Sequence, residues 1–224
     1  MPDDGEPARV LVVCTANVIR SPFVAGLLRT RLEAAGVTGL RLDSAGVSAR
    51  PGRPAETRVR DLGRVYGLDL DAHRSALLDD ARLASGPTVL CAERGHRRTI
   101  LALRPDLVAS VFTIREFARL VEAVGREGEP APREWSELVQ RAARARFADR
   151  HVMDSDDDVV DPIGRSDDVW LQFENQATQA VSTILAAIRA LPAIVAPTEL
   201  GRLTTRREYR RMRDRSARGV SLLD

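Results

Sequence analysis

The sequence predicts an α/β fold: a four-stranded parallel sheet flanked by helices in a doubly wound arrangement. Three observations support this prediction. Residues 9–14 form a short, valine-rich apolar run, which is typical of a strand buried on both faces. Strand patterns and helix patterns then alternate along the chain, an order that favours parallel strands joined by helices. The length of 224 residues suits one large domain with additions.

The elements of the first half follow from apolar spacing and from the residues that begin and end them. Ser21 and Pro22 open the helix after the first strand, a common helix start. Gly46 closes the second strand, and Gly67 closes the helix that follows it. The expected strands are residues 9–14, 40–45, 88–91 and 110–112, and the helices between the last three strands are residues 55–66 and 97–103.

The second half is predicted to be helical. An amphipathic pattern begins at Ile114 and stops at Gly125, and a further helix is expected in an insertion near residues 126–150. The last helix has apolar residues at steps of three and four from Trp170 to Ile188. We therefore expect one domain over residues 1–190, followed by a linker and an arginine-rich, disordered tail over residues 191–224.

Composition excludes several classes of protein. A mean hydropathy of −0.20 and the lack of an apolar run of about 20 residues exclude an integral membrane helix. The acidic start MPDDGEPAR does not resemble a signal peptide, so a cytoplasmic location is expected. Two cysteines and three histidines are too few for a disulfide framework or a metal cage. No metal and no cofactor are therefore expected.

The charge is unevenly distributed. Residues 201–224 contain eight arginines and three acidic residues, a net charge of +5, which leaves −3 for residues 1–200 out of the total of +2. The basic tail therefore suggests a weak anionic partner, and no specific nucleic-acid binding is predicted.

The stretch CTANVIRS, residues 14–21, matches the pattern C-x5-R-S at the carboxyl end of the first strand, where open α/β sheets bind ligands. A loop of this length before a helix can point successive backbone N–H groups inward and form an anion site, which the helix dipole strengthens. An arginine at its end would add a bidentate contact to a phosphate-like oxyanion. The expected phosphate-binding residues are Thr15, Ala16, Asn17, Val18, Ile19 and Arg20.

Cys14 and Asp161 supply the reactive groups of this hypothesis. The field of the anion site also stabilises a thiolate, so Cys14 can be ionised at neutral pH and attack phosphorus. The leaving group then needs a proton donor, and Asp161, which precedes Pro162 in a flexible acidic loop before the last helix, is the best candidate. In the competing interpretation, Cys14 is only a buried strand end that packs as a small hydrophobic residue.

The segments VLVVCTANVIRSP, DSAG at residues 43–46, DAHRS around His73, and the Asp161–Pro162 pair resemble the low-molecular-weight protein tyrosine phosphatase family. The resemblance covers roughly residues 9–190 and is most specific in the loop. It implies a phosphomonoesterase that works through a phosphocysteine intermediate on phosphorylated proteins or small phosphate esters.

The resemblance also implies a role for each residue at a matching position. Cys14 is the nucleophile, Arg20 the phosphate-binding arginine and Asp161 the general acid. The residues that support the loop are Asn17, Ser21, Ser44 and His73. For His73, a surface histidine is the alternative.

The sequence also departs from the family pattern. Ile19 stands where many members carry a second cysteine in the loop, which removes a protective disulfide. Ile163 and Gly164 replace the tyrosines that commonly follow the Asp-Pro pair, and Arg50 takes the place of an aromatic residue on the opposite loop. A pocket without aromatic walls loses stacking of about 0.5–1.5 kcal/mol per contact with a phenyl ring, which weakens the expectation of phosphotyrosine specificity.

Two alternatives to a phosphatase remain open at this point. The same oxyanion loop occurs in arsenate reductases, and a form that passes arsenate to a small thiol needs only one cysteine. A relay through further cysteines has only Cys91 available. The second alternative is a non-catalytic module that binds phosphorylated ligands, although binding alone would not require the cysteine and the acid together.

Overall fold

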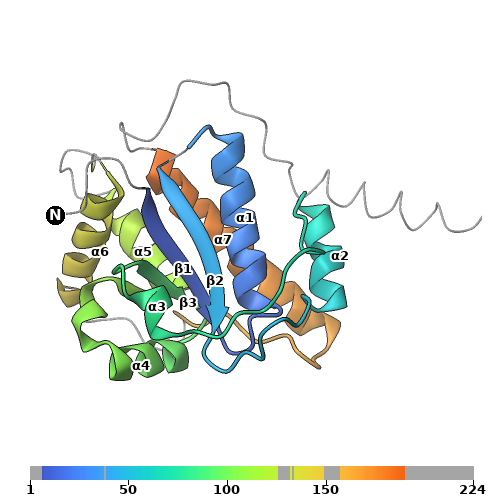
Figure 1. The fold of residues 1–224 in the computed structure, drawn as a ribbon. Coiled ribbons are helices and arrows are strands. Elements are labelled where there is room, and N and C mark those ends of the chain that lie inside the picture. The colour runs from blue at the N-terminus through green and yellow to red at the C-terminus, as the bar shows by residue number, and fades with distance from the viewer. Residues whose placement is uncertain (1–6, 38, 126–131, 133, 149–156, 190–224) are drawn as a thin grey trace, which may run out of the picture.

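The computed structural model describes residues 7–37, 39–125, 132, 134–148 and 157–189. Its centre is a four-stranded parallel sheet in the order β2-β1-β3-β4 (Figure 1). The strands are β1 (Ala8–Cys14), β2 (Leu40–Gly46), β3 (Thr88–Cys91) and β4 (Val111–Thr113). The predicted fold class is thus confirmed, and the strand bounds differ from the expected ones by one residue at most.

Strand β1 lies between β2 and β3, and its side chains alternate between two apolar clusters. Val10, Val12 and Cys14 face the larger cluster, whereas Leu11 and Val13 face the smaller one. This burial on both faces explains why the strand is a continuous apolar run rather than an alternating one.

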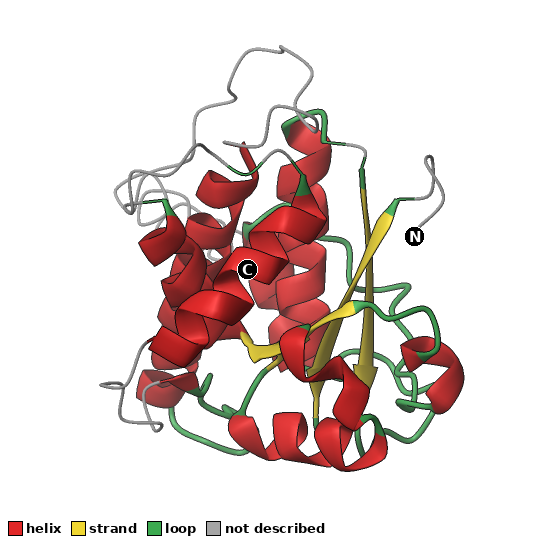
Figure 2. Cartoon of the chain, turned by 90° about the vertical axis from the view of Figure 1, so that its left-hand side faces the viewer, coloured by secondary structure: helices red, strands yellow, loops and turns green. Residues whose placement is uncertain are grey.

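Most helices lie on one side of the sheet, as Figure 2 shows. Helix α7 packs against both α1 and α5, and α6 packs against α5, so that these helices form the larger cluster with β1. Residues from α3, α4 and the 3-10 helix complete the smaller cluster on the other face. The helices are α1 (Arg20–Ala34), α2 (Thr57–Val65), α3 (Asp80–Leu83), α4 (Arg94–Leu103), the 3-10 helix (Pro105–Ala109), α5 (Ile114–Val124), α6 (Trp135–Ala148) and α7 (Asp167–Arg189).

Three helical features differ from the sequence-based expectations. Helix α4 begins at Arg94 rather than at residue 97, because its first turn is polar and carries no apolar periodicity. Helix α3 and the 3-10 helix were not expected, since each is too short to show a periodic pattern. Helix α2 is slightly shorter than predicted, because the Glu56 side chain caps it by accepting from the Arg58 and Val59 amides.

Helix α6 occupies the segment in which the insertion was expected. The Trp135 indole donates to the Thr88 hydroxyl of β3 at 2.9 Å, and Arg146 pairs with Glu116 of α5 at 2.7 Å. The helix is therefore fixed to the start of β3 and to α5 by polar contacts as well as by apolar packing. The division of the chain into a domain over 1–190 and a tail stays a prediction, because residues 190–224 lie outside the described part.

Within the described ranges, none of the helices has both the length and the apolar character that a bilayer crossing requires.

Gly46, the last residue of β2, is in close contact with the loop that follows β1. A Cβ at this position would lie 2.5 Å from the Thr15 carbonyl oxygen and 2.8 Å from the Asn17 amide nitrogen. Real Cβ atoms do not approach backbone this closely, so the glycine lets the loop pass directly over the end of β2.

We expect Gly46→Ala to lower the free energy of unfolding by about 3 kcal/mol, because the methyl group must displace loop backbone rather than a movable side chain. Gly125→Ala is the matched control, since Gly125 has a right-handed helical backbone and its Cβ would lie 3.5 Å from the nearest atom. That control should change stability by less than about 1 kcal/mol. Urea unfolding of both variants checks this, and equal stabilities would contradict the close approach.

Candidate active site

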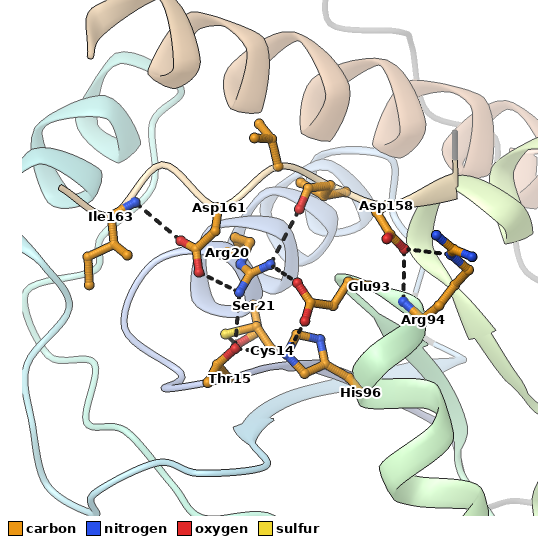
Figure 3. A network of polar contacts seen from close by, with 12 residues as sticks. Cys14, Thr15, Arg20, Ser21, Glu93, Arg94, His96, Asp158, Asp161 and Ile163 are labelled. Carbon is orange, nitrogen blue, oxygen red and sulfur yellow. Dashed lines mark hydrogen bonds and ion pairs between the residues drawn. The ribbon is translucent and has the colours of Figure 1, made fainter. Parts of the chain in front are cut away.

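The loop of residues 15–19 joins the end of β1 to the start of α1. It lies at the carboxyl edge of the sheet. The strand order reverses at this point, because β2 lies on one side of β1 and β3 lies on the other. Open parallel sheets bind ligands at such a point, and the α1 N-terminus adds unpaired backbone N–H groups there. Figure 3 shows the polar side chains that gather around this loop.

The Cys14 sulfur sits at the base of the loop. The Asn17 backbone N–H donates to Sγ at 3.3 Å, and the Ser21 hydroxyl lies 3.0 Å from the same atom. Cys14 is only 3% exposed, so these two polar groups replace the water that a free thiol would have. Both groups can donate a hydrogen bond to the sulfur, and they fix its position at the base of the loop.

Asn17 holds the loop in shape through its backbone and its amide. Its φ of 54° is the left-handed conformation, which asparagine tolerates better than most residues. The Nδ2 group donates to the Ser21 and Ser44 hydroxyls, both at 2.9 Å, and Oδ1 accepts from the Ala76 amide at 2.8 Å. The structure therefore brings Asn17, Ser21 and Ser44 together behind the loop, while their role in catalysis stays a prediction.

His73 supports the same loop from the other side. Its Nε2 donates to the Asn17 carbonyl oxygen at 2.8 Å. Burial lowers the pKa of His73, the Asn17 hydrogen bond opposes that shift, and the nearby Arg29 and Arg74 charges add to it. His73 is therefore a half-buried support of the loop rather than a free surface histidine.

Arg20 is the charged centre of the site and is only 3% exposed. Its Nη1 donates to Glu93 Oε2 at 2.8 Å, and its Nη2 donates to Asp161 Oδ2 at 2.6 Å (Figure 3). Nη2 also donates to the Thr15 hydroxyl at 3.1 Å. The buried positive charge is thus balanced by two carboxylates, whose side chains are 38% and 40% exposed.

The segment that carries Asp161 is anchored on two sides, whereas the sequence suggested a flexible acidic loop. The Val159 amide donates to the Ala92 carbonyl just after β3, at 2.7 Å, and the Val160 amide donates to Gln176 of α7 at 2.9 Å. Asp161 Oδ1 accepts from the Ile163 amide at 3.2 Å. These contacts hold the carboxyl group against Arg20.

Two further aspartates of the acidic run have partners of their own. Asp157 pairs with Arg119 at 3.0 Å, and Asp158 accepts from the Arg94 amide at 2.8 Å. Both side chains therefore serve to fasten the segment, and neither makes the contact with Arg20 that Asp161 makes.

Sequence reasoning missed Glu93 and His96. Glu93 precedes α4 and pairs with Arg20, and His96 Nε2 lies 2.9 Å from the Thr15 hydroxyl. Burial opposes ionisation of Glu93, but the Arg20 hydrogen bond and the nearby positive charges together outweigh it and lower the pKa of that carboxyl. The signal that could have found both residues is their position just after the third predicted strand, since the carboxyl ends of parallel strands share one edge.

The residues that replace the family's aromatic side chains are exposed. Ile163 is 57% exposed beside Asp161, and Gly164 has a left-handed backbone with a φ of 65°. The Arg50 side chain is exposed, while its carbonyl accepts from the Ser75 hydroxyl at 2.5 Å. These three positions therefore offer aliphatic and cationic surface rather than stacking surface.

We expect the lowered pKa of His73 to make stability depend on pH. The unfolded chain takes up a proton near pH 6.5, whereas the folded protein resists it, so the free energy of unfolding falls as the pH decreases below about 7. His73→Gln keeps an Nε2 donor for the Asn17 carbonyl but cannot titrate. Urea unfolding between about pH 7.5 and about pH 5.5 should show a steeper loss for the wild type than for the variant. Parallel curves would contradict the assignment, because His96 contributes equally to both proteins.

Comparison with known proteins agrees with this geometry. Residues 9–130 match the family model described as low molecular weight phosphotyrosine protein phosphatase. A probable low molecular weight protein-tyrosine-phosphatase EpsP of Ralstonia solanacearum is 32% identical over 107 residues, which are 48% of this chain and 70% of that protein. A protein-arginine-phosphatase of Geobacillus stearothermophilus is 32% identical over 111 residues, which are 50% of this chain and 72% of the relative.

A solved structure extends the likeness to the three-dimensional fold. The low molecular weight protein tyrosine phosphatase from T. tengcongensis superposes with a TM-score of 0.56 at 26% identity, covering 80% of this chain and 98% of that one. The part matched by the family model includes all four strands except Ala8 at the start of β1, and it includes the whole loop between β1 and α1. The chain therefore belongs to the low molecular weight phosphotyrosine protein phosphatase family, a family of cysteine-dependent phosphatases.

Proposed function

We propose that this phosphatase acts on phosphotyrosine in proteins, with Cys14 as the nucleophile, Arg20 as the phosphate clamp and Asp161 as the general acid. The observation that carries the proposal is the environment of the Cys14 sulfur, which is buried, faces the Asn17 N–H and the Ser21 hydroxyl, and lies under a loop that ends in Arg20. These contacts hold the sulfur at the base of the loop, from where it can attack a phosphoryl group bound above it.

Phosphate binding uses groups that are already in place. The backbone N–H groups of residues 15–19 and the positive end of α1 supply a cradle for the phosphoryl oxygens. Asn17 and His73 fix the cradle from behind, so little reorganisation is needed when the substrate enters.

Arg20 must exchange a partner when the phosphate binds. In the structure, each of its Nη groups donates to a carboxylate and to one further acceptor. A phosphate dianion that takes an Nη2 hydrogen bond displaces the Asp161 carboxylate. The Asp161 carboxyl group then lies beside the bound phosphoryl group, where a general acid is needed.

The chemical step follows from this arrangement. Cys14 Sγ attacks phosphorus and forms an S–P bond while the P–O bond to the leaving group breaks, and Asp161 gives its proton to the leaving oxygen. In the second half, a water molecule attacks phosphorus, the S–P bond breaks, and Asp161 takes the proton from that water. The cycle releases inorganic phosphate and restores the thiolate.

A second candidate substrate is phosphoarginine. The Geobacillus relative is named as a protein-arginine-phosphatase and is as similar in sequence as the tyrosine-phosphatase relative. Two partly exposed carboxylates, Glu93 and Asp161, lie at the site and could pair with a guanidinium leaving group. The ratio of kcat/KM for a phosphotyrosine peptide and a phosphoarginine peptide of the same sequence distinguishes the two substrates.

The other two alternatives from the sequence are not favoured. The relatives reported above are named as phosphatases, and none of these names refers to arsenate reduction or to binding without catalysis. Cys91 is fully buried in β3, and burial raises the pKa of its thiol, so it is poorly placed to relay a disulfide. The weak anionic partner of residues 201–224 stays a prediction, because those residues lie outside the described part of the chain.

We expect Cys14→Ser to lower kcat for p-nitrophenyl phosphate by about 10⁴-fold or more, because serine lacks the thiolate, while inorganic phosphate still binds to the unchanged loop. Cys91→Ala is the matched control and should keep kcat, since this cysteine lies in the core of β3. Steady-state kinetics and calorimetry check both statements. Turnover by Cys14→Ser near the wild-type rate would remove Cys14 from the mechanism.

We expect Asp161→Asn to slow hydrolysis of phenyl phosphate, whose leaving group needs a proton, by about 10² to 10³-fold. For 2,4-dinitrophenyl phosphate, whose leaving group needs none, the loss should be less than about tenfold. Asp167→Asn is the control, because this exposed aspartate pairs only with Arg58 among the contacts described here. The general-acid role fails if Asp161→Asn slows both substrates equally.

A further inference from the structure

Thr15 and His96 form a contact that the proposed mechanism does not use. Thr15 is an exposed residue directly after the nucleophile, whereas His96 is only 3% exposed. Their side chains meet at 2.9 Å between Oγ1 and Nε2, at the mouth of the loop (Figure 3). A buried imidazole thus holds the hydroxyl of an exposed side chain in one orientation.

The surroundings of the imidazole determine which nitrogen carries the proton. Nε2 faces the Glu93 Oε1 atom at 3.6 Å as well as the Thr15 hydroxyl, so a proton on Nε2 is attracted by the carboxylate whereas a lone pair there would be repelled. Nδ1 is buried and has no hydrogen-bond partner among the described residues. Both observations favour the tautomer in which Nε2–H donates to Thr15 Oγ1.

The imidazole remains neutral in this setting. Burial lowers the pKa of His96, and the Arg20 charge adds to that effect, while Glu93, Asp161 and Asp158 oppose it. A second proton would have to sit on the buried Nδ1, where no described group accepts it.

Thr15 Oγ1 then accepts two hydrogen bonds, one from His96 Nε2 and one from Arg20 Nη2 at 3.1 Å. A hydroxyl oxygen has two lone pairs and one hydrogen, so both lone pairs are occupied and only the O–H remains to donate. We propose that this O–H donates a hydrogen bond to an oxygen of the bound phosphoryl group, with Thr15 as a substrate-contacting residue and His96 as the residue that positions it.

This inference rests on the proposed function, since it places a phosphoryl group above Cys14. It adds a side-chain donor to a cradle otherwise made of backbone N–H groups and Arg20. Because His96 and Arg20 fix the hydroxyl before the ligand arrives, the donor loses little freedom on binding.

The test measures equilibrium binding of inorganic phosphate by calorimetry in four single variants of the full chain. Thr15→Val removes the hydroxyl at nearly constant shape and should raise the Kd about tenfold, whereas Thr15→Ser keeps the hydroxyl and should stay within about threefold. His96→Leu removes the positioning donor and should weaken binding about threefold to tenfold. His96→Gln places an amide donor near the Nε2 position and should restore binding.

The double variant separates positioning from general support. If His96 acts through Thr15, adding His96→Leu to Thr15→Val causes no further loss of phosphate affinity. A persistent loss in that background means that His96 acts through Glu93 instead and overturns the proposal. Unchanged phosphate affinity of Thr15→Val overturns it as well.

A spectroscopic measurement provides an independent check. The imidazole ¹⁵N shifts of His96 in the wild-type protein should show a neutral ring with its proton on Nε2, and a proton on Nδ1 overturns the proposal. Failure of the proposed function would give a different result. A protein that binds phosphate in the expected Thr15-dependent way but hydrolyses no phosphate ester contradicts the proposed function and leaves this inference standing. Normal turnover together with a Thr15-independent Kd contradicts only the inference.

Discussion

The charge of Arg20 organises the site. A guanidinium that is 3% exposed has lost its water and needs compensation by anions and hydrogen-bond acceptors. It finds them in Glu93, before α4, and in Asp161, before α7, which are 73 and 141 residues away along the chain. One cation therefore connects the segments after β1, after β3 and before α7, and the carboxyl edge of the sheet becomes a single polar centre.

The conformation of the loop between β1 and α1 is fixed by contacts with neighbouring elements of the fold. Asn17 adopts a left-handed backbone because its amide binds Ser21, Ser44 and the Ala76 N–H, and Gly46 leaves room for the loop to pass. All of these partners belong to α1, to β2 or to the segment that follows α2. The backbone shape of the loop is thus fixed by contacts within the protein itself, which is the condition for strong electrostatic stabilisation of a bound anion.

Local patterns explain what could be predicted from the sequence. Three short-range features were sufficient: the apolar run of β1, the Ser-Pro helix start and the C-x5-R-S spacing. They placed Cys14 and Arg20 at the carboxyl edge of a parallel sheet, where the structure has them. Glu93 and His96 were not predicted as site residues, because their contacts with Arg20 and Thr15 join positions 73 and 81 residues apart in the sequence. Contacts over such separations produce no periodic pattern. The anchoring of the segment with Asp161 was not predicted for the same reason. It depends on a backbone hydrogen bond to Ala92 and on a hydrogen bond to Gln176 of α7, both distant in the sequence.

The two carboxylates on Arg20 are not equivalent in their surroundings, and this difference suits the proposed division of roles. Glu93 pairs with Arg20 through one oxygen, and its other oxygen lies 3.6 Å from the buried His96 Nε2, so Glu93 is placed to remain the counterion of Arg20. The second oxygen of Asp161 is held only by the Ile163 amide among the contacts described, and the chain turns there at a proline toward the exposed Ile163. In the proposed mechanism, Glu93 stays paired with Arg20 and keeps the guanidinium in place. Asp161 instead gives up its hydrogen bond with Arg20, and the phosphate takes it over. In the proposed mechanism, the exchange that opens Arg20 to the substrate also frees Asp161 to carry the proton, so that binding and acid catalysis would both depend on the Arg20–Asp161 ion pair.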